Sequence, residues 1–579
     1  MNSDGVNIRL GPVLYLVIFL GAFGLRFLSL GEFPLTNLEA VGALEAVRST
    51  PYESGFFPES SVTIPQPAYE ILTRGLFQVF GAENILARMI PSFAGLLLVL
   101  TPLLARKRIG FGHSLLMSLL LAISPIFVTI SRTASGTSLA ALGLMAFLMS
   151  LIGQPGAQSK SSYVIAGVGF GLALASGPWV IFPFISLALA FLFYRLRRSR
   201  KQIAVGKMAW NAEALRPILW IAVIAVFTFT TGIGWSMQGF SRFFESFAFW
   251  IQGWGMGSPY SGLALLVILP TYMPILVFLG ILGVWSSLRQ RDEIGNAASM
   301  MAVFGFALSM VYPYRHPLDL LWVALPFAFL GSKYLLHFVQ EFMDRRVTAW
   351  VFALSSILIT LSFLAYLQMS SKASQTLPVD IFDAWQTPFL FLTLMFVIVS
   401  FFGLGWNWIS AKLSVILAFL CITFILSVSA LWNLNFSSQV YTTNELWRNE
   451  VPSQGLHLLV DTLETTSSSS KGAEEGLNLE IIGEAPAYLL WALREYPPHS
   501  NSVSEDGQAA PVVLVEADQR ELILQADYVG QTLAIGQKWG WRSALPPDFL
   551  KWWIKRDPAT FSSEWLILIR QDIALLLEP

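Results

Sequence analysis

Apolar runs separated by short polar segments occupy most of the chain. A helix that crosses the hydrocarbon core of a bilayer needs about 20 apolar residues, and about 13 runs of roughly 15–25 residues come near that length. The pattern therefore predicts a polytopic α-helical membrane protein. The predicted spans lie at 12–30, 90–105, 113–131, 136–153, 163–177, 178–194, 217–236, 261–286, 297–312, 318–340, 347–369, 387–405 and 410–434.

The run from 163 to 194 is too long for one helix, and Ser176-Gly177-Pro178 interrupts its middle, so we interpret it as a hairpin. With this hairpin, all basic clusters between spans fall on one side of the membrane, which the positive-inside rule makes cytoplasmic. The first loop, the segments 237–260 and 312–317, and the tail then face outward. The run at 12–30 is interpreted as a retained span rather than a signal peptide. The basic clusters are Arg106–Arg108, Arg195–Lys207, Arg289 and Arg291, and Arg345–Arg346.

The tail from 435 to 579 differs from the membrane domain at 1–434, because short β-like runs alternate there with helical stretches. This alternation predicts a small extracytoplasmic α/β domain. A Ser-rich acidic linker is expected at Thr465–Gly476. The predicted strands are Leu456–Val460, Leu479–Ile482, Val512–Glu516 and Trp565–Ile569, and the predicted helices are Ala487–Tyr496 and Pro547–Lys555.

Composition narrows the classes of function. The chain is 55% hydrophobic and 13% charged, and its net charge of −1 gives no indication of a nucleic-acid partner. The single cysteine, Cys421, excludes a disulfide within the chain. Five scattered histidines argue against a His-based metal cluster.

The first outer loop, 31–90, is longer than a membrane hairpin requires. Its apolar residues recur at helical spacing, interrupted by Gly and Pro, which predicts a structured loop. Glu39 stands at the outer mouth of the first span, where it could act as a base or bind a divalent ion. The alternative is an acid that stabilises the N-terminus of a helix capped by Thr36 or Asn37. The other acids of the loop are expected to be solvated: Glu45, Glu53, Glu59 and Glu70.

Basic residues at the outer ends of spans are the second group of candidates. Arg132 follows the third span, and Arg315 and His316 lie in a short outer turn. Cations at this depth suit a lipid phosphate. The alternative is that the arginines extend to the interface without binding a specific ligand.

Several short motifs resemble GT-C glycosyltransferases, and within them the protein O-mannosyltransferase-like branch and the flippase-activity-associated proteins of archaeal N-glycosylation loci. The resemblance covers nearly the whole chain. It includes a long first loop and Glu-Ala after the first span. The other motifs are Ala87-Arg88-x-x-Pro91-Ser92, Ser124-Pro125 with Ser131-Arg132, Pro313-Tyr314-Arg315-x-Pro317 with Leu325-Pro326, and Leu490–Tyr496, Lys551–Asp557 and Ser563–Trp565 in the tail.

The resemblance implies an inverting transferase that takes a sugar from a polyprenyl-phosphate donor at the outer face of the cell membrane. It implies that Glu39 serves as the catalytic base, that Arg132 and Arg315 hold the phosphate, and that a glycan or protein is the acceptor. The chain departs from the family where Leu38 replaces an Asp and where Pro65-Gln66-Pro67 replaces a His-containing stretch. The usual acid after Ser-Arg is also missing.

Three hypotheses follow. The first is a polyprenyl-phosphate-dependent glycosyltransferase, with or without a divalent metal ion. The second is a catalytically silent relative that binds lipid-linked glycans or scaffolds a glycan-assembly complex. The third is a transporter, which we rank last because no repeated halves with interrupted helices are apparent in the sequence.

Overall fold

A computed structural model describes fifteen stretches of the chain. They are 10–48, 64–153, 160–198, 212–290, 292–343, 348–373, 381–437, 445–471, 479–496, 498–500, 510–517, 526–541, 545–546, 549–557 and 560–574. Two acids of the first loop, Glu53 and Glu59, lie outside these stretches, and so does the basic pair Arg345–Arg346.

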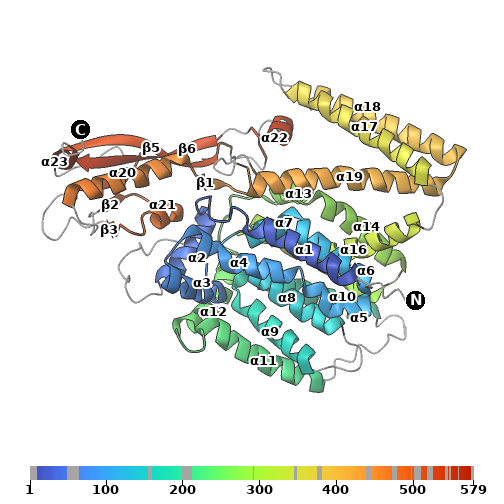
Figure 1. Cartoon of the computed structure of the whole chain (residues 1–579), viewed down its shortest axis with the longest axis horizontal. Helices are drawn as coiled ribbons and strands as arrows, with labels where there is room; N and C mark the ends of the chain where they lie inside the picture. Colours follow the sequence, from blue (N-terminus) through green and yellow to red (C-terminus); the bar gives the residue numbers. More distant parts are fainter. Residues whose placement is uncertain are drawn as a thin grey trace, which may run out of the picture.

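A bundle of apolar helices forms the larger part of the molecule, and a sheet domain lies at one end of it (Figure 1). The helical elements of this part are α1 (Leu10–Phe27), α2 (Asn37–Arg48), α3 (Pro67–Phe80), α4 (Asn84–Leu98), η1 (Thr101–Ala105), α5 (Arg106–Ile109), α6 (Phe111–Ile123), α7 (Pro125–Ser131), α8 (Thr137–Ile152), α9 (Lys160–Ala175), η2 (Pro178–Val180), α10 (Ile181–Arg198), α11 (Ala212–Thr231), α12 (Gln238–Gln252), α13 (Gly262–Tyr272), α14 (Pro274–Gln290), α15 (Glu293–Val311), η3 (Pro317–Leu320), α16 (Leu321–Met343), α17 (Thr348–Ala373), α18 (Ile381–Gly405) and α19 (Trp408–Asn435).

The described residues include six helices that are long and apolar enough to cross a membrane, or nine if each of three bent helix pairs counts as one span. Three shorter apolar helices also coincide with predicted spans: Gly11–Phe27, Thr137–Ile152 and Leu215–Thr231. The helical membrane architecture is confirmed, whereas the number of about 13 spans is not.

Bent helices explain much of the difference between the predicted and the observed number of spans. Lys160–Ala175 and Pro178–Phe193 meet at 116°, so the chain does turn back at the predicted hairpin. Gly177 makes this turn possible, because its φ of 106° lies in the left-handed region. The predicted single span at 261–286 is instead two helices, Gly262–Tyr272 and Pro274–Gln290, bent by 96°. Pro274 begins the second helix without an N–H to donate, which suits a first-turn position.

The first outer loop is folded where it is described. Helices α2 and α3 lie between the membrane helices and the sheet domain (Figure 1). Pro67 begins α3, and Tyr69 and Phe77 of this helix are buried. The expectation that Glu45 and Glu70 are solvated is wrong, because both are buried and bind Arg242 of α12. Removing them from water without a cationic partner would be costly.

The tail forms a six-stranded mixed sheet in the order β1-β5-β6-β4-β2-β3. Strand β4 pairs in parallel with β2 and antiparallel with β6, and β2 pairs in parallel with β3. The predicted C-terminal sheet domain is therefore present. Its elements are β1 (Glu450–Pro452), α20 (Gln454–Lys471), β2 (Leu479–Ile482), α21 (Ala487–Ala492), β3 (Pro498–Ser500), β4 (Val512–Glu516), β5 (Tyr528–Trp539), α22 (Phe549–Lys555), β6 (Thr560–Arg570) and α23 (Gln571–Ala574).

One predicted strand of the tail is wrong. Leu456–Val460 belongs to helix α20, which continues to Lys471 and so also includes the first residues of the predicted linker. Leu456, Leu459 and Leu463 are buried at spacings of three and four, which place them on one face of a helix. The apolar run was too short to separate a strand from a buried helix by its pattern.

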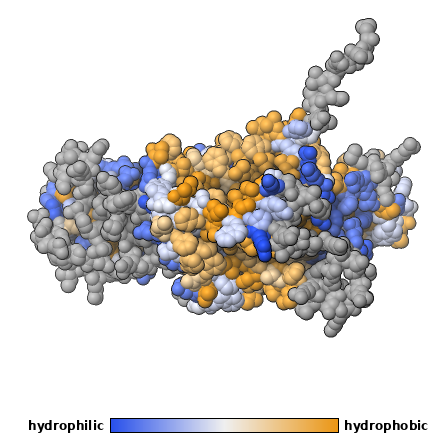
Figure 2. All heavy atoms as spheres, turned by 90° about the horizontal axis from the view of Figure 1, so that it is seen from below, coloured by the Kyte–Doolittle hydropathy of each residue, from blue (hydrophilic) through white to orange (hydrophobic). Residues whose placement is uncertain are grey.

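The surface separates into zones along the long axis of the molecule. Figure 2 shows a hydrophobic band over the helices, with a hydrophilic region beyond it at each end. The sheet domain and the first-loop helices lie at one end, and basic helix α5 lies at the other (Figure 1). The first loop and the tail thus share one side of the band, which agrees with the predicted sidedness. Which side faces the cytoplasm stays a prediction.

Candidate functional site

A cavity of about 80 Å³ lies where the first loop, the membrane helices and the start of the tail meet. One water needs about 10–15 Å³, so the cavity has room for several waters or a phosphate-sized group. Its charged and polar lining residues are Thr36, Asn37, Glu39, Arg88, Thr129, Arg132, Thr133, Tyr260, His316, Asn435, Arg448, Asn449 and Glu450.

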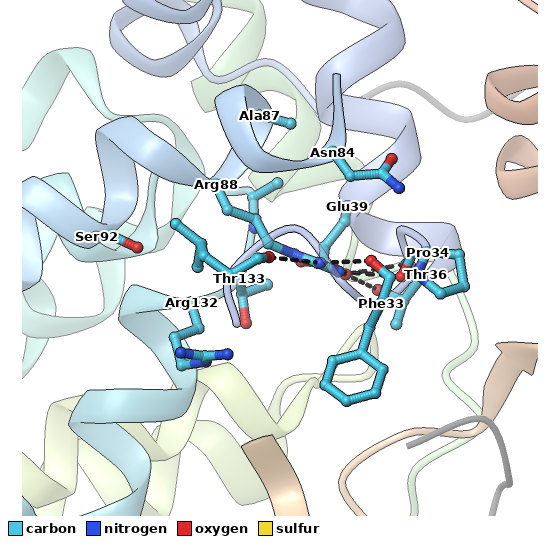
Figure 3. Close-up of polar contacts among 12 residues, drawn as sticks. Phe33, Pro34, Thr36, Glu39, Asn84, Ala87, Arg88, Ser92, Arg132 and Thr133 are labelled. Carbon is cyan, nitrogen blue, oxygen red and sulfur yellow. Dashed lines mark hydrogen bonds and ion pairs between the residues drawn. The ribbon is translucent and has the colours of Figure 1, made fainter. Parts of the chain in front are cut away.

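Glu39 is held by five hydrogen bonds. Arg88 donates from Nε to Oε1 at 2.7 Å and from Nη2 to Oε2 at 2.9 Å, and the two side chains point toward one another in Figure 3. The N–H and hydroxyl of Thr36 and the N–H of Ala134 supply the other bonds. A carboxylate has about four lone-pair sites. In this geometry Glu39 therefore has none free for the proton of an acceptor.

The local fold explains why Glu39 is placed there. Glu39 lies three residues after Thr36, and its carboxylate reaches back to the Thr36 N–H at 2.9 Å, as the third residue of a helix does in a capping box. Asn37, the alternative cap, instead accepts the N–H of Ala487 at 2.7 Å and so ties α2 to the tail.

Electrostatics keep Glu39 ionised. Burial raises the pKa of this carboxyl, but the charge and hydrogen bonds of Arg88 and the N–H groups of Thr36 and Ala134 outweigh burial and lower the pKa to about 2. A carboxylate with such a low pKa is a weak base at neutral pH.

Arg88 uses all five of its N–H groups. Besides Glu39, it binds the carbonyls of Leu30 at 3.2 Å, Phe33 at 2.7 Å and Pro34 at 3.0 Å (Figure 3). It belongs to the Ala-Arg-x-x-Pro-Ser motif, whose pattern alone does not reveal this role. The motif therefore closes the first loop onto helix α4.

Arg132 lines the cavity, as expected of a phosphate ligand, but most of its donors are engaged. Its Nη1 binds the carbonyls of Leu25, Arg26 and Leu28 at 3.2, 3.3 and 2.7 Å, and its Nη2 binds Ser29 at 3.1 Å. These carbonyls lie at or just beyond the C-terminus of α1. The last carbonyls of a helix have no N–H partner within the helix. Arg132 thus brings positive charge to the cavity while capping a helix.

The structure places Arg315 and His316 differently. His316 lines the cavity, whereas Arg315 is not among the described lining residues and donates its Nε to the Tyr312 carbonyl at 2.9 Å. Nδ1 of His316 accepts the Leu318 N–H at 3.2 Å, and burial lowers the His316 pKa to about 3. His316 is therefore a neutral group with its proton on Nε2, rather than a cation.

Two residues of the tail complete the cavity. The side chain of Arg448 makes one hydrogen bond within the described part of the chain, from Nη2 to the Leu434 carbonyl at 2.9 Å. Glu450 accepts the Tyr488 hydroxyl at 3.2 Å, and its Oε1 lies 3.5 Å from Lys538 Nζ. The cavity therefore gathers two carboxylates, Glu39 and Glu450. Their separation of about 400 residues hides the pair from a motif search.

The donor set does not favour a bound metal. No group of three or more His, Cys, Asp or Glu side chains gathers anywhere in the described stretches. The oxygens of Glu39 already accept hydrogen bonds, which leaves Glu450 as the available carboxylate.

Comparison with solved structures shows that the chain has the fold of ArnT, in agreement with the resemblance to GT-C proteins seen in the sequence. ArnT from Cupriavidus metallidurans bound to undecaprenyl phosphate is 14% identical with a TM-score of 0.57, and the match covers 87% of this chain and 93% of ArnT. The apo state of ArnT gives 15% identity, a TM-score of 0.53 and coverage of 88% and 93%.

The oligosaccharyltransferase AglB from Archaeoglobus fulgidus, in complex with an inhibitory peptide and a dolichol-phosphate, is 13% identical with a TM-score of 0.48. That match covers 88% of this chain and 69% of AglB. Comparison with protein-family models and with curated protein sequences finds no match. At these identities the likeness to ArnT establishes the fold, and the narrower branch suggested by the sequence stays a prediction.

Proposed function

We propose that the protein is a glycosyltransferase that moves a sugar from a polyprenyl-phosphate carrier to an acceptor on the side of the tail. The supporting observation is the cavity, because Arg132 and Arg448 bring cations there beside two carboxylates and the neutral donor His316. The geometry suits a phosphate monoanion or diester close to a group that can take a proton.

In this proposal the acceptor hydroxyl attacks the anomeric carbon of the donor sugar. The bond from that carbon to the phosphate oxygen breaks, and polyprenyl phosphate leaves with the electron pair. The proton of the hydroxyl passes to a carboxylate. Arg448 and Arg132 stabilise the charge that the phosphate gains.

Glu450 is our choice for the proton acceptor, in place of Glu39. Both line the cavity, but Glu39 has its lone pairs occupied and a low pKa, while Glu450 has an oxygen, Oε2, with no partner among the described residues. Glu39 is assigned a positioning role, in which it holds Arg88 and the first loop in place.

The test is a transfer assay with the full-length protein in proteoliposomes, using radiolabelled undecaprenyl-phosphate hexoses and a crude cell-envelope acceptor. Glu450→Gln should lower the rate by about 10²-fold or more, since general base catalysis contributes about 10²–10⁴-fold. Glu495→Gln is the matched control, because Glu495 is an exposed carboxylate of the same domain. A Glu450→Gln protein with wild-type turnover would exclude Glu450 as the base. A folded Glu39→Gln protein with a 10²-fold loss would return the role to Glu39.

Phosphate binding is tested separately with undecaprenyl phosphate. Arg448→Gln should weaken binding by roughly 10–100-fold, the effect of a hydrogen bond to a charged group worth about 1.5–3 kcal/mol. Arg448 is preferred to Arg132 for this test, because removing Arg132 also removes the cap of α1.

A catalytically silent relative is the second candidate, and one observation favours it. Leu38 lines the cavity at the position of the family's Asp, and the neighbouring Glu39 is fully engaged. This candidate predicts no turnover by the wild-type protein with any tested hexose, together with undecaprenyl phosphate binding that Arg448→Gln weakens.

A further inference from the structure

A second cavity, of about 530 Å³, lies between α14, α16, α18 and α19. Its lining includes the last turn of α14 and the first turn of α19, and both lie at the end of the bundle away from the sheet domain (Figure 1). It is therefore separate from the cavity beneath the first loop.

The charged residues of this cavity are both cations. Arg289 of α14 and Lys412 of α19 line it, and none of its lining residues is acidic. Neither cation has a carboxylate partner among the described residues, and Arg289 instead lies over the Trp285 ring at 4.6 Å. Such an arrangement attracts an anion.

The remaining walls are apolar or aromatic. Val399 of α18 and Val415 and Ile416 of α19 form part of the lining. Trp285 and Trp408 line it as well and are 58% and 55% exposed, as expected of tryptophans at a membrane interface. Helix α18 is itself largely exposed, because only 6% of its apolar segment Pro388–Gly405 is buried inside the molecule. A ligand of this cavity therefore combines an anionic group with hydrocarbon.

We propose that this cavity binds an anionic glycerophospholipid of the leaflet on the side of α5, with its phosphate between Arg289 and Lys412 and the start of an acyl chain along Val399 and Val415. Basic pockets between membrane helices are suited to anionic headgroups. A free phosphate ion would leave the apolar wall without a partner, which is why a lipid is the better occupant. The proposal does not depend on the transfer reaction.

The experiment is native mass spectrometry of the full-length protein in detergent, with equal amounts of phosphatidylglycerol and phosphatidylcholine added. The wild-type protein should bind phosphatidylglycerol preferentially. The double variant Arg289→Gln/Lys412→Gln should bind it roughly tenfold or more weakly, because each cation near the membrane surface contributes about 1 kcal/mol. Lys107→Gln/Arg108→Gln is the control, since it removes two exposed charges from α5 on the same side and should leave binding within about twofold of wild type.

A second variant tests the contribution of the cavity's space separately from that of its two cations. Ser286→Phe fills the space and keeps both cations, so it should also reduce binding while size-exclusion behaviour and melting temperature stay near wild type. Equal binding of the two lipids, equal losses in the α5 control, or undiminished binding by a folded Ser286→Phe protein would each overturn the proposal. Displacement by inorganic phosphate would point to a free anion, and preferential displacement by undecaprenyl phosphate would point to the carrier lipid; either would overturn the phospholipid assignment.

Discussion

At the scale of single residues, the properties of the cavity beneath the first loop depend on which groups each arginine donates its hydrogen bonds to. Arg88 is fully engaged with Glu39 and three carbonyls, and Arg132 caps α1. Arg448 makes a single side-chain hydrogen bond among the described residues and carries its charge to the same cavity. Both Arg132 and Arg448 line the cavity, but Arg448 is the better position for testing phosphate binding, because a substitution of Arg132 would also remove the cap of α1.

The Glu39–Arg88 pair predicts a pH dependence of stability. The pKa of Glu39 is lowered to about 2 in the folded protein, so the pair contributes stability above the unfolded pKa near 4.5, and this contribution is lost as the pH falls toward 2. Thermal unfolding in detergent should show the wild-type melting temperature decreasing across this window. Glu39→Gln should flatten that decrease, and an unchanged slope would contradict the assigned pKa.

Removal of one partner from this pair should be costly at neutral pH. Arg88→Met leaves the carboxylate of Glu39 buried without its cation, so we expect a loss of about 3–5 kcal/mol in the free energy of unfolding. The double variant Arg88→Met/Glu39→Leu should recover part of the loss, because it removes the uncompensated charge. Chemical denaturation of the three proteins measures both effects. A single variant as stable as wild type would show that the pair does not hold the loop.

At the scale of elements, the tight turn between α9 and α10 decides how these two helices lie. The α9–α10 turn needs Gly177, where a side chain would be strained by the positive φ and would place Cβ 2.7 Å from the Pro65 carbonyl oxygen. Pro65 precedes α3, so this turn also supports the first loop. A membrane hairpin and an outer helix are thus positioned by one glycine.

Gly177→Ala should destabilise the protein by about 1–3 kcal/mol, the usual cost of a strained backbone position. Gly24→Ala is a matched control, because Gly24 lies in helix α1 and an added Cβ would meet nothing within 4 Å. That substitution should be neutral or slightly stabilising, since Ala is favoured over Gly in a helix. Melting temperatures of the two variants compare the positions, and equal values would contradict the role of Gly177.

At the scale of the whole molecule, the tail is fastened to the first loop as well as to the last span. Trp491 Nε1 donates to Asn84 Oδ1 at 2.7 Å, and Arg494 Nε donates to the Ala82 carbonyl at 2.9 Å. With the bond from Ala487 to Asn37, these contacts close the tail over the outer loop. The cavity is formed by this closure, because Arg448 and Glu450 reach it from the tail side.

The sidedness of the molecule can be tested with single cysteines in a Cys421→Ala background. A cysteine at Glu495, which is exposed in the tail, should react with a membrane-impermeant thiol reagent in intact cells. A cysteine at Lys107 in basic helix α5 should react only after permeabilisation, because basic segments remain in the cytoplasm. The opposite labelling pattern would reverse the orientation.

The sequence by itself determined the membrane class, the position of the apolar helices, the hairpin at Gly177 and three of the six described strands of the sheet, because these follow from local periodicity and from residues that restrict the backbone. It also predicted that Glu39 and Arg132 lie at the ends of spans, and both line the cavity next to the tail. Only the tertiary structure decided that Glu39 is paired with Arg88, that Arg132 caps a helix and that Arg448 and Glu450 complete the cavity. Those facts depend on contacts between residues far apart in the chain, and a hydrogen-bond partner supplied by packing leaves no local pattern.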